Sequence, residues 1–351
     1  MTRIWKGTAV ALGVLALAVA GCGGGDDEAS GTAAETGGAA TSEAATDVKV
    51  GLVTDVGQLN DRGFNQLAFE GVKQAKKELG IEYRVIESAS DSDYVPNMQA
   101  LADDGYDLIV GVGFAQGEAI ATVAKEYPDT KFAIIDVDQA SLPGAPPNVV
   151  GLLFKEEQAG YLAGVLAATV AKDEGIDSIS SVGGMKEPPV DRFIAGYQAG
   201  AKATLPGITL LNGYSQDWDD VAKCKEVALD QISRGSKIVF QVAGGCGLGA
   251  LDAAEQKSVF GIGVDGDQSF LGPHVLTSAL KRVDSAVLLT IKSVVDGNFK
   301  GGTNATYGLE DDGVGLGTMS PKVGADAKAA VDEAREQIAS GEISDIPTTV
   351  S

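Results

Sequence analysis

The residues of this chain best suited to chemistry are carboxylates, an amide and an aromatic ring that follow apolar runs. Asp55 follows the first such run and precedes the pair Phe64-Asn65, while Asp136 and Asp265 follow two later runs. Carboxylates and amides form hydrogen bonds, and an aromatic ring offers a flat apolar face. This set favours recognition of a small polar molecule over bond cleavage.

The sequence has few residues that could perform acid–base catalysis or bind a metal ion. The sequence contains one histidine, His274, and three cysteines. A Ser-His-Asp triad would depend on that one imidazole, and a zinc site would lack ligands. We therefore expect no catalytic residue, no metal site and no cofactor, in a protein that is not an enzyme.

The charge and the composition limit the kinds of partner that the protein can bind and the class of protein to which it can belong. Among 351 residues, 49 Asp and Glu outnumber 27 Lys and Arg, which gives a formal net charge of −22. Nucleic acid is disfavoured as a partner because phosphate backbones require a basic surface. With 44% hydrophobic and 22% charged residues, the chain is neither a disordered acidic tail nor a membrane bundle, and its length favours about two domains of roughly 150 residues.

Strand-length apolar runs alternate with helix-length amphipathic stretches from residue 48 onward. This order is typical of parallel sheets covered by helices on both faces, so we predict an α/β fold with two doubly wound lobes. The predicted strands are 48–54, 82–87, 108–112, 132–137, 149–154, 178–182, 208–213, 237–243, 259–264 and 275–280. The predicted helices are 64–79, 95–102, 116–127, 156–171, 190–205, 219–234, 247–256, 285–296 and 325–339.

These elements predict where a ligand would bind. In doubly wound sheets the ligand lies outside the carboxyl ends of the strands, which is where the carboxylates and the Phe64-Asn65 pair fall. Each residue also has a purely structural interpretation, because Asp commonly caps a helix and Phe can staple its start. Recurrence at several strand ends favours ligand binding.

Residues 1–21 have the pattern of a signal peptide. Arg3 and Lys6 precede an apolar run at 9–20, which is shorter than the roughly 20 residues of a membrane-spanning helix. The run ends in Val-Ala-Gly-Cys22, which resembles a bacterial lipobox. We expect Cys22 to carry a lipid; the alternative is an ordinary signal peptide with a coincidental cysteine.

A tether is expected to follow the lipidated cysteine over residues 22–47. Beyond Cys22 it contains only Gly, Ala, Ser, Thr, Asp and Glu. Such residues cannot build a core, so the tether is predicted to be disordered. A lipid and a short tether imply a partner in the same membrane, outside the cytoplasm.

The segment from Asp55 to Gln66 resembles the D-x-G-x-x-x-D-x-S/G-F-N-Q signature of the BMP (basic membrane protein) family. Members of that family are lipoproteins that serve as substrate-binding proteins of ABC nucleoside importers. The resemblance covers essentially the whole folded part, in order along the chain. Further matching segments are 132–136, 154–164, 182–185, 240–245, 263–265 and 277–281.

The resemblance implies a type I periplasmic-binding-protein-like fold with three crossover segments between two lobes. It implies a nucleoside ligand, a purine being favoured, that is delivered to ABC permease and ATPase subunits by closure of the lobes. We expect a monomer anchored by lipid on the extracytoplasmic face of the cell membrane. We place lobe 1 at 48–153 plus 276–302 and lobe 2 at 154–275 plus 303–351.

Residue roles in the family carry over by motif position. Phe64 would stack on the base, and Asn65 and Asp136 would form hydrogen bonds with it. Asp265 and Lys281 would hold the ribose, with Lys281 also offsetting the charge of Asp265.

Two positions at the edge of the expected site complete this assignment. Asp55 would lie at the cleft edge, and Val242 occupies the region where some members place a second aromatic residue. This departure leaves the second face of the base open to other aromatic residues, namely Phe114, Tyr94 or Trp218.

Other functions remain as alternatives. The same fold would suit a surface sensor or adhesin, or a carrier of another solute such as riboflavin or a sugar. Residues 245–250 also match the glycine pattern of a dinucleotide-binding turn, with Asp265 eighteen residues beyond Gly247. An NAD-dependent enzyme is disfavoured because no acid–base partner accompanies this turn.

Two cysteines remain after Cys22, and we predict that they form a disulfide. Cys224 lies near the start of a predicted helix, and Cys246 follows the next strand. Helix and following strand run antiparallel, so the start of the helix and the end of the strand are neighbours. An exported protein meets oxidising conditions; the alternative is two free buried thiols.

Overall fold

The computed structural model describes residues 46–350. The predictions for the signal peptide, for Cys22 and for nearly all of the tether therefore lie outside the described residues. Within residues 46–350, no helix combines the length and the apolar character needed to cross a bilayer.

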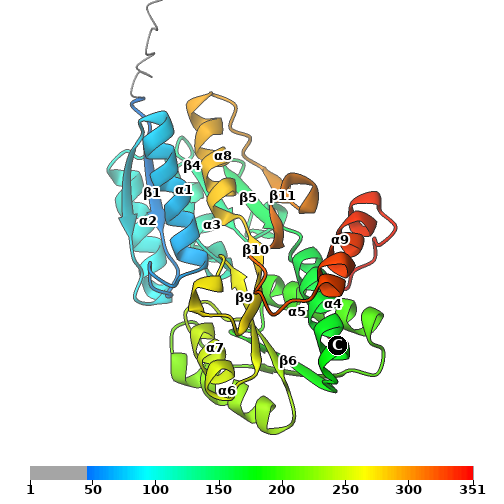
Figure 1. The fold of residues 1–351 in the computed structure, drawn as a ribbon. Helices are drawn as coiled ribbons and strands as arrows, with labels where there is room; N and C mark the ends of the chain where they lie inside the picture. Colours follow the sequence, from blue (N-terminus) through cyan, green and yellow to red (C-terminus); the bar gives the residue numbers. More distant parts are fainter. Residues whose placement is uncertain (1–45, 351) are drawn as a thin grey trace, which may run out of the picture. The chain divides into compact units, whose positions relative to one another are not determined.

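Two six-stranded sheets form the frame of the fold, as predicted (Figure 1). Within the two sheets all paired strands are parallel except β12, which runs antiparallel to β10. The first sheet has the order β11 (Thr303–Tyr307), β5 (Val149–Phe154), β4 (Lys131–Ile135), β3 (Leu108–Gly111), β1 (Lys49–Val53) and β2 (Glu82–Ile86). The second has the order β12 (Val314–Leu316), β10 (Val275–Lys281), β9 (Phe260–Asp265), β8 (Ile238–Val242), β6 (Ser178–Gly183) and β7 (Thr209–Tyr214).

Helices cover both faces of the first sheet, which explains why its strands are apolar without interruption. Along β3, Leu108 and Val110 pack into the core under α1 (Phe64–Leu79) and α8 (Val283–Val295). Ile109 points the other way, toward α2 (Tyr94–Asp103) and α3 (Gly117–Glu126). Successive side chains of a strand face opposite sides, so both sides of lobe 1 exclude water.

The second sheet repeats this arrangement in lobe 2. One face packs against α4 (Glu156–Glu174) and α5 (Pro188–Thr204), and α9 (Ala325–Ser340) lies against α4. The other face packs against α6 (Val221–Ser233) and α7 (Gly247–Gln256). Because the two sheets have equivalent strand orders, equivalent strands bring their carboxyl ends to the same place in each lobe.

The chain crosses between the lobes three times, and this corrects two of the expected lobe borders. The crossings follow β5, β10 and β11. Strand β10 belongs to the second sheet, although residues from 276 were assigned to lobe 1, because the crossing follows the strand instead of preceding it. Strand β11 belongs to the first sheet, although residues from 303 were assigned to lobe 2.

Strands β11 and β12 were missed because they carry no apolar run. The sequence of β11 is Thr-Asn-Ala-Thr-Tyr, and β12 has only three residues. Both lie at a sheet edge, where a strand pairs on one side only and needs little apolar surface. Their pairing is set by the crossing chain and not by a pattern that the sequence displays.

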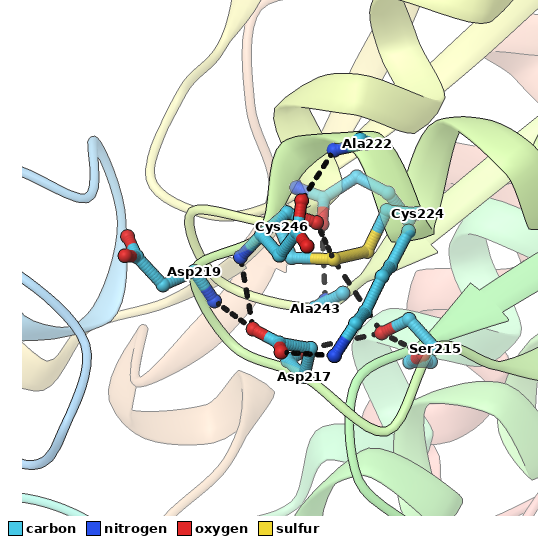
Figure 2. The surroundings of a disulfide bond; sticks show 11 residues. Ser215, Asp217, Asp219, Ala222, Cys224, Ala243 and Cys246 are labelled. Carbon is cyan, nitrogen blue, oxygen red and sulfur yellow. Dashed lines mark hydrogen bonds and ion pairs between the residues drawn. A yellow bond between two sulfur atoms is a disulfide. The ribbon is translucent and has the colours of Figure 1, made fainter. Parts of the chain in front are cut away.

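The structure contains the expected disulfide between Cys224 of α6 and Cys246, whose Cα atoms lie 5.5 Å apart (Figure 2). Both residues are fully buried. The bridge closes a loop of 22 residues and, in the chain-entropy treatment, stabilises the fold by about 3 kcal/mol. It joins the start of α6 to the start of α7 on one face of lobe 2.

Candidate functional site

A cavity lies between the two lobes, where the carboxyl ends of both sheets meet. All seven residues expected to bind a ligand line it, and so do the three alternative aromatic residues. The expected residues are Asp55, Phe64, Asn65, Asp136, Val242, Asp265 and Lys281, and the aromatic residues are Tyr94, Phe114 and Trp218. Residues that are far apart in the sequence thus come together at one cavity.

Lys281, the last residue of β10, is the buried cation of this cavity. Its Nζ lies 2.6 Å from Asp136 Oδ1 and 3.0 Å from Glu156 Oε1, and the three side chains are at most 5% exposed. Nζ also lies 5.0 Å from the centroid of the Phe64 ring. Burial by itself would lower the pKa of Lys281, but the carboxylates of Asp136 and Glu156, with that of Asp265, outweigh it and raise the pKa.

The ion pair of Lys281 with Asp136 joins the lobes, because Asp136 follows β4 of lobe 1. Glu156 begins α4 in lobe 2, and the sequence analysis did not single it out. Burial raises the pKa of Glu156 to about 7 against the opposing charge of Lys281. A buried charge of this kind is tolerated only when it is paired, so the three side chains form one unit.

Asp136 and Asp265 occupy equivalent places, at the ends of the equivalent strands β4 and β9. Both have a left-handed backbone, with φ of 72° and 61° respectively. This region costs about 1 kcal/mol or more for a residue other than glycine, and such residues concentrate at binding sites. The shared geometry turns both carboxylates into the same cavity.

The carboxylate of Asp265 is uncommitted, and Lys281 offsets its charge without a direct ion pair. Lys281 forms its ion pairs with Asp136 and Glu156, and not with Asp265. Among the described residues, no side chain or backbone group donates a hydrogen bond to the Asp265 carboxylate. Burial raises the pKa of Asp265 to about 7, although Lys281 opposes this. The oxygens of Asp265 are thus available to a ligand.

Asn65 supports Asp55. Its Nδ2 donates to Asp55 Oδ1 at 2.7 Å and to the Gly57 carbonyl at 3.3 Å, and Asn65 is 2% exposed. The other oxygen of Asp55, Oδ2, points toward the backbone at Gly113, where an added Cβ would lie 3.1 Å away. Burial raises the pKa of Asp55 to about 7, against the hydrogen bond from Asn65. In this arrangement Asn65 holds the carboxylate that faces the cavity.

Asp61 fixes the start of α1, and the sequence analysis did not name it as a site residue. Its Oδ1 accepts from Gly63 N at 2.9 Å, and its Oδ2 accepts from Asn65 N at 2.8 Å. Asp61 lies three residues before the predicted helix start at Phe64, and an Asp near a helix start is the sequence signal that could have indicated this capping role. Asp61 thereby places Phe64 and Asn65 at the cavity.

Trp218 lines the cavity close to Val242, in the region where the sequence lacks an aromatic residue. Its ring packs on Gly184, where a Cβ would lie 2.4 Å from the ring. It comes from the segment between β7 and α6, so no motif around Val242 could have revealed it. Phe114 also lines the cavity, and it is 40% exposed.

The cavity is strongly acidic. Its lining includes Asp55, Asp61, Asp136, Asp265 and Glu187, and Lys281 is the cation among the lining residues. Burial also raises the pKa of Glu187 to about 7. The described residues contain no group of His, Cys, Asp and Glu arranged to hold a metal. An acidic lining disfavours phosphate and favours a ligand that offers N–H and O–H donors.

Two α/β lobes joined by three crossings, with a polar and aromatic cavity between them, define a solute-binding protein. The family model described as "ABC transporter substrate-binding protein PnrA-like" (Bmp) matches residues 48–348. The chain belongs to this family and is an ABC transporter substrate-binding protein.

Relatives and a solved structure agree with the family. The chain is 35% identical over 363 residues to the "ABC transporter nucleoside-binding protein BmpA" of Lactococcus lactis, covering 97% of this chain and 98% of the relative. It is 38% identical over 291 residues to an "uncharacterized lipoprotein" of Pyrococcus abyssi, covering 80% and 71% respectively. A solute-binding protein of Aeropyrum pernix has a similar structure, with a TM-score of 0.76 and 29% identity, covering 86% of this chain and 94% of that one.

Proposed function

We propose that the protein binds a nucleoside, with a purine favoured, between its lobes and delivers it to ABC permease and ATPase subunits. The observation that carries this proposal is the uncommitted carboxylate of Asp265 in the cavity that Phe64 lines. The lactococcal relative named as nucleoside-binding supports the same ligand class.

The chemistry of the cavity suits a nucleoside part by part. The Phe64 ring matches the flat face of a base, and an aromatic pair adds about 0.5–1.5 kcal/mol beyond burial. In this proposal, Asp136 and Asp55, the latter held by Asn65, accept hydrogen bonds from the base edge, and Asp265 accepts from the ribose hydroxyls. A nucleotide is disfavoured because its phosphate would face several carboxylates.

The direct test is a thermal-shift screen against purine and pyrimidine nucleosides, free bases, riboflavin and sugars. A nucleoside present at 100 times its Kd is expected to stabilise the protein by about 2.7 kcal/mol. Stabilisation by riboflavin or a sugar, with none by any nucleoside, would favour those alternatives. No response to any of these solutes would favour a sensor or adhesin.

Removal of the ribose hydroxyls is expected to weaken binding at least about tenfold, because Asp265 would remain buried without its partner. Calorimetry with adenosine and 2′,3′-dideoxyadenosine measures this difference. The Asp265→Ala variant should bind both compounds equally. If the wild-type protein binds both equally, Asp265 has no role at the sugar.

We also propose that Cys22 carries a lipid that anchors the protein at the extracytoplasmic membrane face. Cys22→Ser is expected to move the protein from the membrane to the soluble fraction, because a lipid anchor requires that thiol. Cell fractionation and immunoblotting measure the shift. Ser30→Ala is the matched control, since it changes a side chain of the expected tether, keeps the Cys22 thiol and should leave the protein at the membrane. An unchanged distribution of the Cys22→Ser variant would contradict the anchor.

A further inference from the structure

The segment 215–220, which connects β7 to α6, brings one residue to the cavity and another to lobe 1. The ring of Trp218 lines the cavity wall. Asp219 Oδ2 accepts a hydrogen bond from Nε2 of Gln58, in lobe 1, at 3.3 Å. This cleft segment therefore contacts both the ligand space and the opposite lobe, although it belongs to lobe 2.

The backbone of the cleft segment is folded around one carboxylate (Figure 2). Asp217 Oδ1 accepts from the backbone N of Asp219 at 2.9 Å and of Asp220 at 2.8 Å. Its Oδ2 lies 2.8 Å from Lys223 Nζ. These hydrogen bonds, that from Asp220 foremost, lower the pKa of Asp217. The Asp217 carboxylate therefore stays ionised, and able to accept these hydrogen bonds, at neutral pH.

The disulfide fixes the far end of the cleft segment. Cys246 N donates to the carbonyl of Trp218 at 2.9 Å, and Cys246 Sγ lies 3.0 Å from the carbonyl oxygen of Asp220. Cys224 ties this sulfur to the first turns of α6, directly after the segment. At the near end, Ser215 N donates to Gly183 O at 2.9 Å. Both ends are thus anchored.

The anchored backbone of the cleft segment determines the position of the Trp218 ring, because the ring packs tightly and has little room to move. Gly184 leaves no room for a Cβ beneath the ring, so the ring follows the backbone of the cleft segment closely. The Asp219–Gln58 hydrogen bond depends on the same backbone. Since Cys224 and Cys246 are fully buried, the bridge is shielded from reductants and acts as a permanent constraint.

We propose that the Cys224–Cys246 disulfide positions the ligand site: it holds the cleft segment so that Trp218 forms one wall of the cavity and Asp219 reaches lobe 1. This inference rests on the proposed function, because the same cavity would hold the nucleoside. Cys224 and Cys246 are positioning residues, because they affect binding only by holding Trp218 and Asp219 in place.

The test compares two variants of the full chain purified in detergent. The double variant Cys224→Ser with Cys246→Ser removes the bridge. The control Lys225→Met removes a different link between α6 and α7, the 2.6 Å ion pair of Lys225 with Asp252, and leaves the cleft segment untouched. Hydrogen exchange by mass spectrometry follows the segment, and calorimetry with adenosine and guanosine gives Kd.

The double variant is expected to exchange the amides of residues 215–220 at least about tenfold faster, because local opening sets the exchange rate. Its Kd for the nucleosides should rise at least about tenfold, since binding must then order the segment. Lys225→Met should change neither quantity. Unchanged exchange, a Kd within twofold of wild type, or equal effects in the control would overturn the inference.

Two other results of this experiment, a double variant that does not fold and a wild-type chain that binds no nucleoside, also test the inference. If the double variant does not fold, Asp217→Ala replaces it, since that change releases the turn while the disulfide stays intact; it should weaken binding by the same factor, and unchanged binding would overturn the inference. If the wild-type chain binds neither nucleoside, the proposed function fails, and hydrogen exchange alone then decides whether the disulfide holds the segment.

Discussion

Lys281→Met is expected to lower the free energy of unfolding by about 3–5 kcal/mol, because removing one partner of a buried ion pair leaves the other charge without compensation. Here two carboxylates, those of Asp136 and Glu156, would lose their cation while at most 5% exposed. The variant should also bind ligand more weakly, since the ion pair that joins Lys281 of lobe 2 to Asp136 of lobe 1 at the cavity would be lost. Urea unfolding at pH 7.5 measures the first effect.

Lys155→Met is the matched control. Lys155 forms an ion pair with Glu310, and its side chain is 37% exposed. An exposed pair contributes about 0–1 kcal/mol, so this variant should unfold nearly as the wild type does. The loss in Lys281→Met should also shrink at pH 5.5, where Glu156, with its pKa raised to about 7, can take up a proton. Equal, small losses in both variants would contradict the assignment.

The sequence predicts most of the fold because burial on both sides of a parallel sheet leaves an unbroken apolar run for each inner strand. The run 108–112 became β3, and the run 149–154 became β5. Edge strands carry no such requirement, so β11 was missed and a lobe border was misplaced with it. The position of an edge strand depends on where the chain crosses, which is a property of the assembled lobes.

The sequence also predicts which residues reach the cavity, because the ligand position follows from strand ends alone. It does not predict their partners. Glu156 lies in a helix start that carries two consecutive glutamates, and only the assembled fold shows that one of them is fully buried against Lys281. Similarly, Trp218 reaches the gap beside Val242 from a segment more than twenty residues earlier in the chain.

Acidification from pH 8 to 5.5 is expected to stabilise the unliganded protein. Burial raises the pKa of Asp55, Asp265 and Glu187 to about 7, so the folded state holds protons that the unfolded state releases above about pH 4. This stability is lost as the pH rises through 7. One such carboxyl contributes about 2 kcal/mol between pH 7 and 5.5. The groups with a lowered pKa, such as Asp217, lose their contribution only below this window.

Ligand binding should show the opposite dependence on pH. A nucleoside offers N–H and O–H donors, which form stronger hydrogen bonds with ionised carboxylates than with protonated carboxyls. Every carboxyl that must release its proton weakens binding about tenfold for each pH unit below its pKa, or about 30-fold at pH 5.5. Urea unfolding and calorimetry at pH 5.5 and 8 measure the two trends on the same protein. Asp265→Asn, which cannot titrate, should reduce the pH slope of stability by about 1.4 kcal/mol per unit.

These opposite trends distinguish a binding site from a purely structural acidic cluster. If the cavity carboxylates served only to pair with Lys281, acidification would change stability and leave affinity unaffected. If they accept hydrogen bonds from a bound nucleoside, the pH that best stabilises the empty protein is the pH at which it binds most weakly. Affinity that stays constant or rises at pH 5.5 would exclude the ionised carboxylates as ligand acceptors. An unchanged pH slope of stability in Asp265→Asn would contradict the raised pKa of Asp265.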